Sequence, residues 1–577
     1  MSTFEGATAV LALLALTVRL AGHQHRLLHL LQLEHYEGAR LMLWLRRRDE
    51  LFAAHELIAV VLLFAAGVAA FSSGSGWLCG VLLLLVSPLS ALGVGDWRRP
   101  AVKPLVLTGR AKRLFAASLA PPVLLTVAAV ALAAIGLSTA TLALLLALGA
   151  LLLAGAPWTL LLANLALRPL QSAINRRYVQ RAQRSLSNWA PLVVGVTGSY
   201  GKTTTKFCIG AVLSTDRPTL VTPESYNSFL GVIRTINEQL RKHHRAFVVE
   251  MGMFRRGDIA ELCELVRPSV GVITAIGPMH LERLGSIEQI AAAKGELLQA
   301  LPANGHFITN ANDPRCLELA AGAAVPVTLF GIEAGEGAVA AASHSAGMSQ
   351  GTPNPSPNNT PPVQVIARNI RLADGRTNFE LQLDGPSSPA LAVSAGLLGA
   401  HNVLNLLAAA AVGRVLEIEP ARIIEGLSQV EAPAHRLQPI HNRRASIVVI
   451  DDAYNSNPDG AASALEVLRE HPATRRLLVT PGMVELGELE AGLNRRFGEH
   501  AGAVCDLVIL VGPARTVPIR EGLAAAGMDA ANVHVVQSIA EATTLLARLT
   551  RAGDVVLFEN DLPDTYSEAQ ATALSAS

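Results

Sequence analysis

The sequence predicts an α-helical transmembrane region followed by an α/β part, in which a P-loop central domain precedes a Rossmann-like C-terminal domain. Three observations predict this class. Hydrophobic residues make up 51% of the 577 residues and charged residues 16%, with a mean hydropathy of +0.37, and the apolar excess lies in the first third of the chain. From about residue 191, short apolar runs alternate with amphipathic stretches, as in βαβ units. A glycine-rich loop follows the first of these runs.

The first third contains five apolar runs, which predict about five membrane-spanning helices. The last two runs are each long enough for the ~20 residues that a spanning helix needs. The first run is short, and a cleaved signal peptide is the alternative. Its basic residues follow the apolar run instead of preceding it, which favours a spanning helix. The five runs cover residues 7–18, 57–71, 77–92, 114–137 and 139–167.

Basic residues between these runs predict the orientation. Residues 40–48, 98–113 and 176–184 are rich in arginine and lysine, whereas the intervening short connections carry no charge. The positive-inside rule then places the N-terminus outside and the part of the chain after the fifth run in the cytoplasm. The apolar runs lack the paired Asp, Glu or His residues of an ion pathway. We therefore expect residues 1–185 to be the membrane region of an integral membrane protein, with membrane lipids as partners.

Charge balance and cysteine spacing exclude other classes. The formal net charge is +1, from 47 Lys and Arg against 46 Asp and Glu, so no polybasic field draws the chain to nucleic acid. The five cysteines lie far apart, with neither C-x-x-C spacing nor a framework pattern. This spacing argues against a zinc ribbon and a disulfide scaffold and favours a reducing compartment.

After the membrane region, the alternation predicts two α/β domains, residues 186–440 and 441–577. A segment rich in Ser, Pro, Gly and Asn, residues 335–363, interrupts the first domain. It has few large apolar groups to offset its ordering entropy, so we expect a disordered insertion. The predicted strands are residues 192–197, 246–251 and 270–276 in the first domain, and 446–451, 476–480, 506–511, 533–536 and 554–558 in the second.

The strongest chemical signal is VTGSYGKTTTK, from Val196 to Lys206, directly after the first predicted strand. A glycine turn that opens a helix points backbone N–H groups at phosphate oxygens. Lys202 adds a positive charge, and the Thr203 hydroxyl can bind Mg²⁺. Val196 stands where the strict G-x-x-x-x-G-K-[ST] pattern has glycine, so the loop is the shorter T-G-x-x-G-K-T form. The order of strand, loop and helix favours a nucleotide site over a chance glycine turn.

The loop resembles the ATP loop of the Mur ligases, and seven further segments in matching order resemble the branch of that family that adds D-alanyl-D-alanine to a muramoyl tripeptide. The resemblance covers roughly residues 190–570 and not the membrane region. It implies a Mur-ligase central ATP-binding domain, a C-terminal Mur-ligase domain and a ligase of peptidoglycan precursor synthesis. The seven segments are TPESYNSFLGV (222–232), VVEMGMFRRGDI (248–259), ITAIGPMHLERLGSIEQIAAAKGELLQALPANG (273–305), ITNANDP (308–314), GAHNVLNLLAAAA (399–411), DDAYNSNPDG (451–460) and PGMVELGE (481–488).

The chemistry of amide formation suits particular side chains. A carboxylate needs a better leaving group than hydroxide, and transfer of the ATP γ-phosphate makes an acyl phosphate, with metal ions and cations neutralising the crowded oxygens. Glu250 ends an apolar strand at its C-terminal edge, where ligands of parallel sheets bind, and a carboxylate suits Mg²⁺. His280 follows another such strand. A solvated carboxylate and a capping histidine are the alternatives, which a P-loop in the same sheet disfavours.

For Lys294, in IAAAKGELL, the residues alone favour a surface lysine. The resemblance implies instead a carbamylated lysine that helps to hold a second Mg²⁺. On this basis the expected catalytic residues are Lys202, Glu250, His280 and Lys294. The expected ligands of two Mg²⁺ ions are Thr203, Glu250, His280 and Lys294.

The resemblance also implies residues for the nucleotide and the carboxylate substrate. Asp452, in preference to Asp451, matches an acid that contacts ribose, so ATP is expected between two lobes whose closure excludes water. The expected ATP-binding residues are Gly198, Ser199, Tyr200, Gly201, Lys202, Thr203, Thr204, Asn310, Asn312, Arg436 and Asp452. Those expected at the substrate are Asn227, His401 and Asn402. Capping of the following helix is an equal alternative for the last two.

Both substrate ends depart from the family pattern. Membrane spans replace the soluble domain that holds the UDP-sugar, and residues 555–566 replace a Lys-Gly-Ser segment beside the incoming amine. We therefore expect a carboxylate substrate that is lipid-linked or a UDP-muramoyl peptide, and an amino acid or dipeptide as the amine. The alternatives are a ligase that makes another poly-amino-acid or polyglutamate product, a P-loop ATPase coupled to transport, and a silent scaffold. Hydrolysis of ATP without an acceptor amine would indicate the ATPase.

Overall fold

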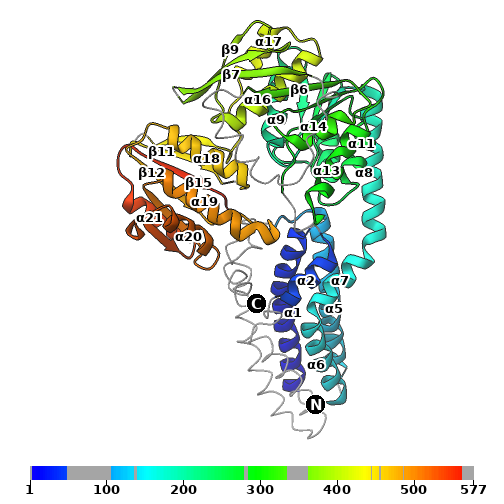
Figure 1. The fold of residues 1–577 in the computed structure, drawn as a ribbon. Helices are drawn as coiled ribbons and strands as arrows, with labels where there is room; N and C mark the ends of the chain where they lie inside the picture. Colours follow the sequence, from blue (N-terminus) through cyan, green and yellow to red (C-terminus); the bar gives the residue numbers. More distant parts are fainter. Residues whose placement is uncertain are drawn as a thin grey trace. The chain divides into compact units, whose positions relative to one another are not determined.

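The computed structural model describes residues 3–34, 36–47, 105–135, 139–278, 284–333, 362–373, 375–442, 445–453, 456–484 and 486–561. The chain divides into two compact units, one ending at Arg177 and one beginning at Tyr178 (Figure 1). The predicted spans 57–71 and 77–92 and nearly all of the insertion 335–363 lie outside the described residues, and so does His280.

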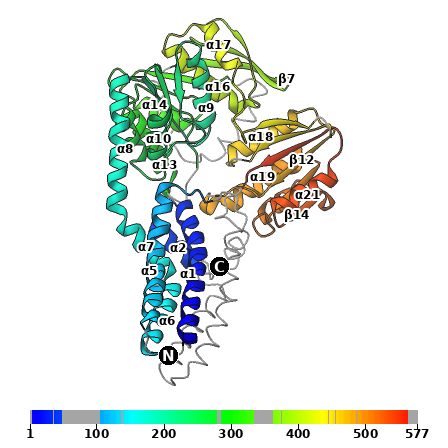
Figure 2. The same cartoon turned by 180° about the vertical axis from the view of Figure 1, so that it is seen from behind.

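The first unit is a bundle of apolar helices. Figures 1 and 2 show α1, α5, α6 and α7 running side by side. A leucine-rich core joins them, and it includes Leu20 and Leu28 of α1, Leu114 of α5 and Leu160 of α7. The helices are α1 (Thr3–Leu33), α2 (Gly38–Arg47), α5 (Gly109–Ala134), α6 (Thr139–Ala154), α7 (Ala156–Ala166) and the start of α8 (Arg168–Trp189).

Two of the predicted spans differ from the structure. The predicted run 139–167 is two helices, because Pro157 stands in the first turn of α7 and cannot donate a backbone hydrogen bond to the end of α6. Helix α1 continues well beyond the predicted run 7–18. By length and composition, one stretch of the described helices, Gly109–Leu132 (24 residues, hydropathy 2.0), is long and apolar enough to cross a membrane.

The second unit begins with a nine-stranded sheet in the order β2-β3-β1-β4-β5-β6-β7-β8-β9. From β2 to β7 in this spatial order, which includes β1, each strand is parallel to its neighbour. Strand β8 is antiparallel to β7, and β9 is antiparallel to β8. The bounds are β1 (Leu192–Thr197), β2 (Thr219–Val221), β3 (Ala246–Glu250), β4 (Val270–Ile273), β5 (His306–Asn310), β6 (Val327–Ile332), β7 (Val363–Ala373), β8 (Arg376–Gln382) and β9 (Leu391–Ala395). The three predicted strands of this domain are therefore confirmed as β1, β3 and β4.

Helices cover both faces of this sheet, so its strands are apolar on both sides. Val194 and Val196 of β1 pack in one core and Val193 packs in the other. One face carries α9 (Lys202–Ser214), α16 (Ala400–Val415) and α17 (Pro420–Ser428). The other carries α10 (Phe229–Gln239), α11 (Asp258–Val266), α13 (Ile287–Gln299), α14 (Pro314–Ala321) and the end of α8.

A six-stranded sheet follows, in the order β10-β11-β15-β12-β13-β14, parallel except for the edge strand β10. Its strands are β10 (Gln438–Asn442), β11 (Ile447–Asp452), β12 (Arg475–Thr480), β13 (Leu507–Val511), β14 (Val533–Val536) and β15 (Asp554–Glu559). On one face pack α18 (Pro458–Glu470), α19 (Glu490–Val504) and α20 (Val517–Ala525), and on the other packs α21 (Ile539–Leu549). The five predicted strands are confirmed with shifts of one residue, and β10 was not predicted.

Candidate functional site

The glycine-rich loop joins the end of β1 to the first turn of α9. Gly201 has φ +74° and Gly198 has φ +153°, conformations that L side chains rarely adopt. A Cβ at Gly201 would lie 2.3 Å from Oδ1 of Asn405, and one at Gly198 would lie 1.9 Å from Oγ1 of Thr274. Only glycine fits at both positions, so the loop can present its backbone N–H groups at the start of a 13-residue helix. This is the geometry of a phosphate site.

The side chain of Lys202 lies over this loop. Its Nζ donates to the carbonyl oxygens of Gly198 (2.7 Å) and Ser199 (3.1 Å). Burial lowers the pKa of Lys202 to about 8, with Glu250 raising it and Arg436 lowering it further. The amine therefore stays mostly protonated at pH 7 and can neutralise phosphate oxygens.

Ser199 and Tyr200 hold the loop against the segment after β4. Oγ of Ser199 donates to the carbonyl of Gly277 (3.0 Å) and accepts from its N–H (2.9 Å). The ring of Tyr200 lies so close to Gly277 that a Cβ there would be 2.5 Å from the hydroxyl. Thr204 is buried on α9. These side chains therefore fix the loop's conformation from inside the protein.

Glu250, at the end of β3, is the centre of a polar cluster and is 1% exposed. Thr203 Oγ1 donates to its Oε2 (3.0 Å), Lys206 Nζ lies 2.9 Å from the same oxygen, and Asn227 Nδ2 donates to Oε1 (2.9 Å). Burial alone would raise the pKa of Glu250, but Lys206, then Lys202, and hydrogen bonds outweigh it and hold that pKa below its usual value. Glu250 is thus a buried carboxylate beside the hydroxyl of Thr203, and these two oxygen groups are suitable ligands for Mg²⁺.

Lys294, on α13, is 3% exposed, so it is not the surface lysine that the residues alone favour. Burial lowers its pKa well below the usual value, and the nearby charge of Lys202 lowers it further. Both effects favour the neutral form of this amine. A neutral amine is the nucleophile that carbon dioxide needs to form a carbamate, so this environment fits the modified lysine implied by the resemblance.

Asn310 and Asn312 lie at the C-terminal end of β5, on the edge of the sheet that holds Glu250. Asn310 is 4% exposed, donates to the carbonyl of Thr274 (3.2 Å) and accepts from the N–H of Asn312 (2.9 Å). The Asn312 amide pairs with the backbone of Ile332 through bonds of 3.1 and 2.8 Å. Both side chains tie neighbouring strand ends together, which shapes the surface at these two expected ATP-binding positions.

The substrate candidates on α16 are partly engaged in supporting the phosphate loop. Thr205 Oγ1 donates to Oδ1 of Asn405 (2.9 Å), and Asn405 Nδ2 donates to Oδ1 of Asn402 (2.8 Å). Asn402 in turn donates to the carbonyl of Leu398 (2.8 Å). His401 differs, because its Nδ1 is buried without a hydrogen-bond partner among the described residues. His401 is therefore the better candidate for a ligand contact.

Asp452 ends β11 beside Glu559, which ends the neighbouring strand β15. Asp452 Oδ1 accepts from the N–H of Leu437 (3.1 Å), and Ser456 Oγ donates to Oε1 of Glu559 (2.6 Å). Burial raises the pKa of Asp452 to about 6 and that of Glu559 well above its usual value, as expected for two acids that share a proton. Arg436 lies close enough to shift the pKa values of both Asp452 and Lys202.

The structure thus brings Lys202, Thr203, Glu250 and Lys294 to the phosphate loop. Sequence reasoning missed two residues. Lys206 follows Lys202 by one helical turn, a spacing that puts both on one face of α9. Glu559 directly follows a predicted strand, as Asp452 does, and the strand order that makes them neighbours is not visible in the sequence.

Comparison with known proteins agrees with this geometry. Residues 196–413 match the Mur ligase middle domain, and residues 435–559 match the Mur ligase, glutamate ligase domain. The UDP-N-acetylmuramoyl-tripeptide–D-alanyl-D-alanine ligase of Mycobacterium leprae is 31% identical over 383 residues, which are 64% of this chain and 70% of the relative. The Escherichia coli protein of the same name is 33% identical over 321 residues, which are 56% of this chain and 64% of the relative.

Solved structures give the same result. MurF from Acinetobacter baumannii superposes with a TM-score of 0.56 at 27% identity, over 69% of this chain and 80% of that chain. MurF from Thermotoga maritima, solved in complex with ADP, shares the fold with a TM-score of 0.55 at 24% identity, over 70% and 82% of the two chains.

Proposed function

Because this chain belongs to the Mur ligase family, we propose that it is a MurF-like, ATP-dependent ligase of peptidoglycan precursor synthesis that joins a carboxylate to an amine through an acyl phosphate. The observation that carries this proposal is that three features lie around Lys202: a loop in which two positions accept only glycine, the buried carboxylate Glu250 and the buried lysine Lys294. Phosphoryl transfer needs this positioning of charge more than covalent help from the protein.

We assign roles to these side chains as follows. The loop N–H groups and Lys202 bind the ATP phosphates, and Arg436 and Asp452 bind the nucleotide from the C-terminal domain. Thr203, Glu250, His280 and carbamylated Lys294 hold two Mg²⁺ ions, which neutralise phosphate oxygens when bound. Asn227 keeps Glu250 oriented, and Asn402 supports the loop through Asn405. Asn227 and Asn402 thus have positioning roles, whereas the family pattern alone suggested substrate contacts for them.

The substrates follow from the relatives. Their names specify a UDP-muramoyl tripeptide and D-alanyl-D-alanine. The family match of this chain begins at residue 196, and a bundle of apolar helices precedes it. We therefore propose that the muramoyl peptide is presented at the membrane surface, either on its UDP carrier or on a lipid.

The test is a ligase assay on the full-length chain with ATP, UDP-muramoyl tripeptide and D-alanyl-D-alanine. Phosphate release should require both the carboxylate and the amine, and mass spectrometry should show the joined peptide. Lys202→Ala should lower kcat at least about 100-fold, as loss of one transition-state donor does, whereas Lys242→Ala, at an exposed position, should not. Phosphate release without an amine would support an ATPase, and a product with glutamate only would support the polyglutamate alternative.

We also propose that the first unit anchors the chain in a bacterial inner membrane with the ligase domains in the cytoplasm. The long apolar helix α5 and the arginines beside it support this placement. The expected result is a chain that stays with the membrane fraction after an alkaline carbonate wash. Release of the chain by that wash would contradict membrane insertion without affecting the ligase proposal.

A further inference from the structure

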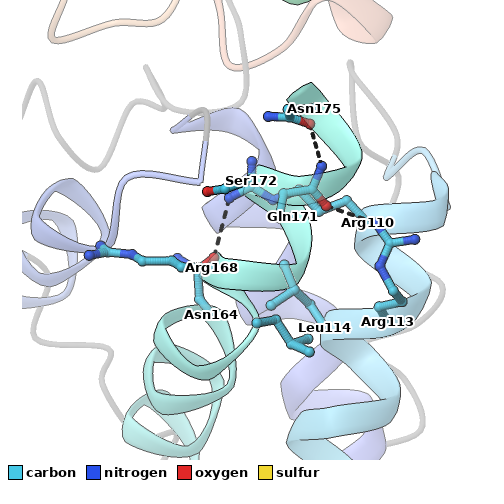
Figure 3. Close-up of a pocket in the computed structure, with 9 residues that line it drawn as sticks. Arg110, Arg113, Leu114, Asn164, Arg168, Gln171, Ser172 and Asn175 are labelled. Carbon is cyan, nitrogen blue, oxygen red and sulfur yellow. Dashed lines mark hydrogen bonds between the residues drawn. The ribbon is translucent and has the colours of Figure 1, made fainter. Parts of the chain in front are cut away.

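The first unit contains a polar cavity of about 160 Å³ where α5 begins and α7 gives way to α8. Figure 3 shows it between Arg110 and Arg113 of α5 and the first turns of α8, with Arg168 extending in another direction. The cavity is several times larger than one ordered water requires and is too small for a nucleotide. Its lining residues are Arg110, Arg113, Leu114, Asn164, Leu167, Arg168, Gln171, Ser172 and Asn175.

The lining contains three arginines and no acid. Glu34 and Glu37, two acids of the first unit, pair with Arg40 at 3.5 and 3.0 Å. The guanidinium groups of Arg110 and Arg113 therefore lie at this cavity without a carboxylate of the lining to neutralise them, whereas the side chain of Arg168 extends away from them (Figure 3). Such an arrangement has an unfavourable self-repulsion, which a bound anion removes.

The amide side chains hold the arginines in place and use their acceptor atoms in doing so. Oδ1 of Asn164 accepts from Arg110 (3.3 Å), and Oε1 of Gln171 accepts from Arg113 (2.7 Å). Gln171 donates onward to Asn175 (2.7 Å). Each guanidinium carries five N–H donors, so donors remain in excess over acceptors in the lining. A ligand with several oxygen acceptors matches this excess.

Arg110 is fixed further by stacking. Its guanidinium carbon lies 4.0 Å from the centre of the Tyr36 ring, and Asn164 Nδ2 donates to the carbonyl of Tyr36 (3.1 Å). The connection between α1 and α2 thus supports one wall of the cavity. A guanidinium whose face is stacked keeps its N–H edge for a ligand, which is the usual geometry of phosphate recognition by arginine.

The cavity also lies at the boundary between charged and apolar surface. Arg110 and Arg113 are in the first turns of α5, which is apolar from there to its end, and Leu114 and Leu167 complete the lining. An amphiphile can therefore place its charged group among the arginines and its chain along the leucines. A free anion would use only the polar part of this surface.

We propose that this cavity, the arginine pocket, binds the phosphate group of a membrane lipid, with Arg110 and Arg113 as its ligands. A phosphate offers more oxygen acceptors than a carboxylate and suits two guanidinium groups of one helix. The proposal rests on the membrane placement proposed above. It adds a specific lipid site to what would otherwise be a general basic border of the bundle.

The experiment measures lipid binding to the full-length chain in a neutral detergent by native mass spectrometry, with dioleoyl phosphatidic acid as the probe. Arg113→Gln is the main variant and Arg110→Gln is the second, because both half-buried side chains line the cavity. Arg177→Gln, on α8, exposed and outside the lining, is the matched control because it removes the same charge away from the cavity. Inorganic pyrophosphate serves as the soluble competitor.

Binding should saturate at one lipid, and each pocket variant should weaken it on the order of tenfold, as loss of a charge-assisted bond does. The control should weaken binding by no more than about fivefold, the effect of one surface charge. Equal losses in the pocket variants and the control would overturn the proposal, as would binding without saturation. Pyrophosphate that binds as tightly as the lipid would overturn the lipid assignment. A chain that leaves the membrane in the carbonate wash refutes the membrane placement, whereas a chain that stays but fails these comparisons refutes only the arginine pocket.

Discussion

The ion pair between Lys206 and Glu250 makes a quantitative prediction about the site. The two charged atoms lie 2.9 Å apart, and the side chains are 0% and 1% exposed. Burial lowers the pKa of Lys206, and Lys206 in turn is the main charge that lowers the pKa of Glu250. Replacing one member of a buried pair leaves the other charge without its partner, which costs about 3–5 kcal/mol. Lys206→Met should therefore destabilise the protein by that amount.

The measurement is differential scanning calorimetry of the full-length chain. For a domain of this size the loss corresponds to a fall of roughly 6–20 °C in the unfolding midpoint of the second unit. The double variant Lys206→Met/Glu250→Gln should recover much of it, because no buried charge is then left uncompensated. Lys242→Met, at an exposed position, is the control and should change the midpoint by about 1 °C or less. If Lys206→Met behaves like this control, the buried ion pair does not hold Glu250 in its charged form.

Three further predictions concern the same unit. Gly201→Ala should abolish ATP binding measured by calorimetry, because φ is +74° and the new Cβ meets an amide oxygen at 2.3 Å; Gly257→Ala, with φ +95° but no atom within 4 Å, should retain it. Glu559→Gln should remove a pH dependence of the free energy of unfolding. The raised pKa values of Asp452 and Glu559 mean that the folded pair keeps a proton that the unfolded acids lose, so the wild type loses about 1.4 kcal/mol of stability per pH unit from about pH 4.5 upward until the pair ionises. If denaturant titrations give the variant and the wild type the same dependence of stability on pH, this reasoning is contradicted. Lys294→Ala should lose ligase activity and regain part of it when acetate is added, because acetate supplies a carboxylate in place of the carbamate. The control Lys242→Ala should keep its activity and should not respond to acetate. If acetate restores no activity to Lys294→Ala, and the wild type keeps normal activity in carbon dioxide-free buffer, the carbamate is contradicted.

The strands and the phosphate loop could be predicted because their signals are local. A run such as residues 192–197 is apolar throughout because both faces of the sheet are covered, and the glycines of the loop follow it directly. Lys294 could not be placed from its own neighbourhood. Its helix buries Ile290, Ala293 and Leu297 against the sheet, and the lysine beside Ala293 is carried into the same interior. Only the packing of α13 shows this.

The first unit shows the opposite limit. Hydropathy locates apolar residues but not the ends of helices. Helix α1 continues past the run 7–18 because polar side chains can remain helical where a neighbouring helix satisfies them, as Gln24 does by donating to the carbonyl of Ala156 at 2.8 Å. The predicted run 139–167 is apolar throughout its length, so its hydropathy does not show that Pro157 divides it into two helices.

The phosphate loop owes its shape to residues far from it in the sequence, and this has a consequence for nucleotide binding. The side chains of Thr274 and Asn405 pack against Gly198 and Gly201, and the carbonyl of Gly277 accepts a hydrogen bond from Ser199. Ordering the backbone costs about 1–2 kcal/mol per residue, and here that cost is met when the domain folds. Binding of a triphosphate then need not order the loop, so more of its interaction energy remains for affinity and for the transition state. The network from α16 to the loop is thus a reason to expect that Asn405→Ala weakens nucleotide binding without touching the nucleotide, by freeing the loop at Gly201. Unchanged affinity in that variant would show that the loop is ordered by its own sequence.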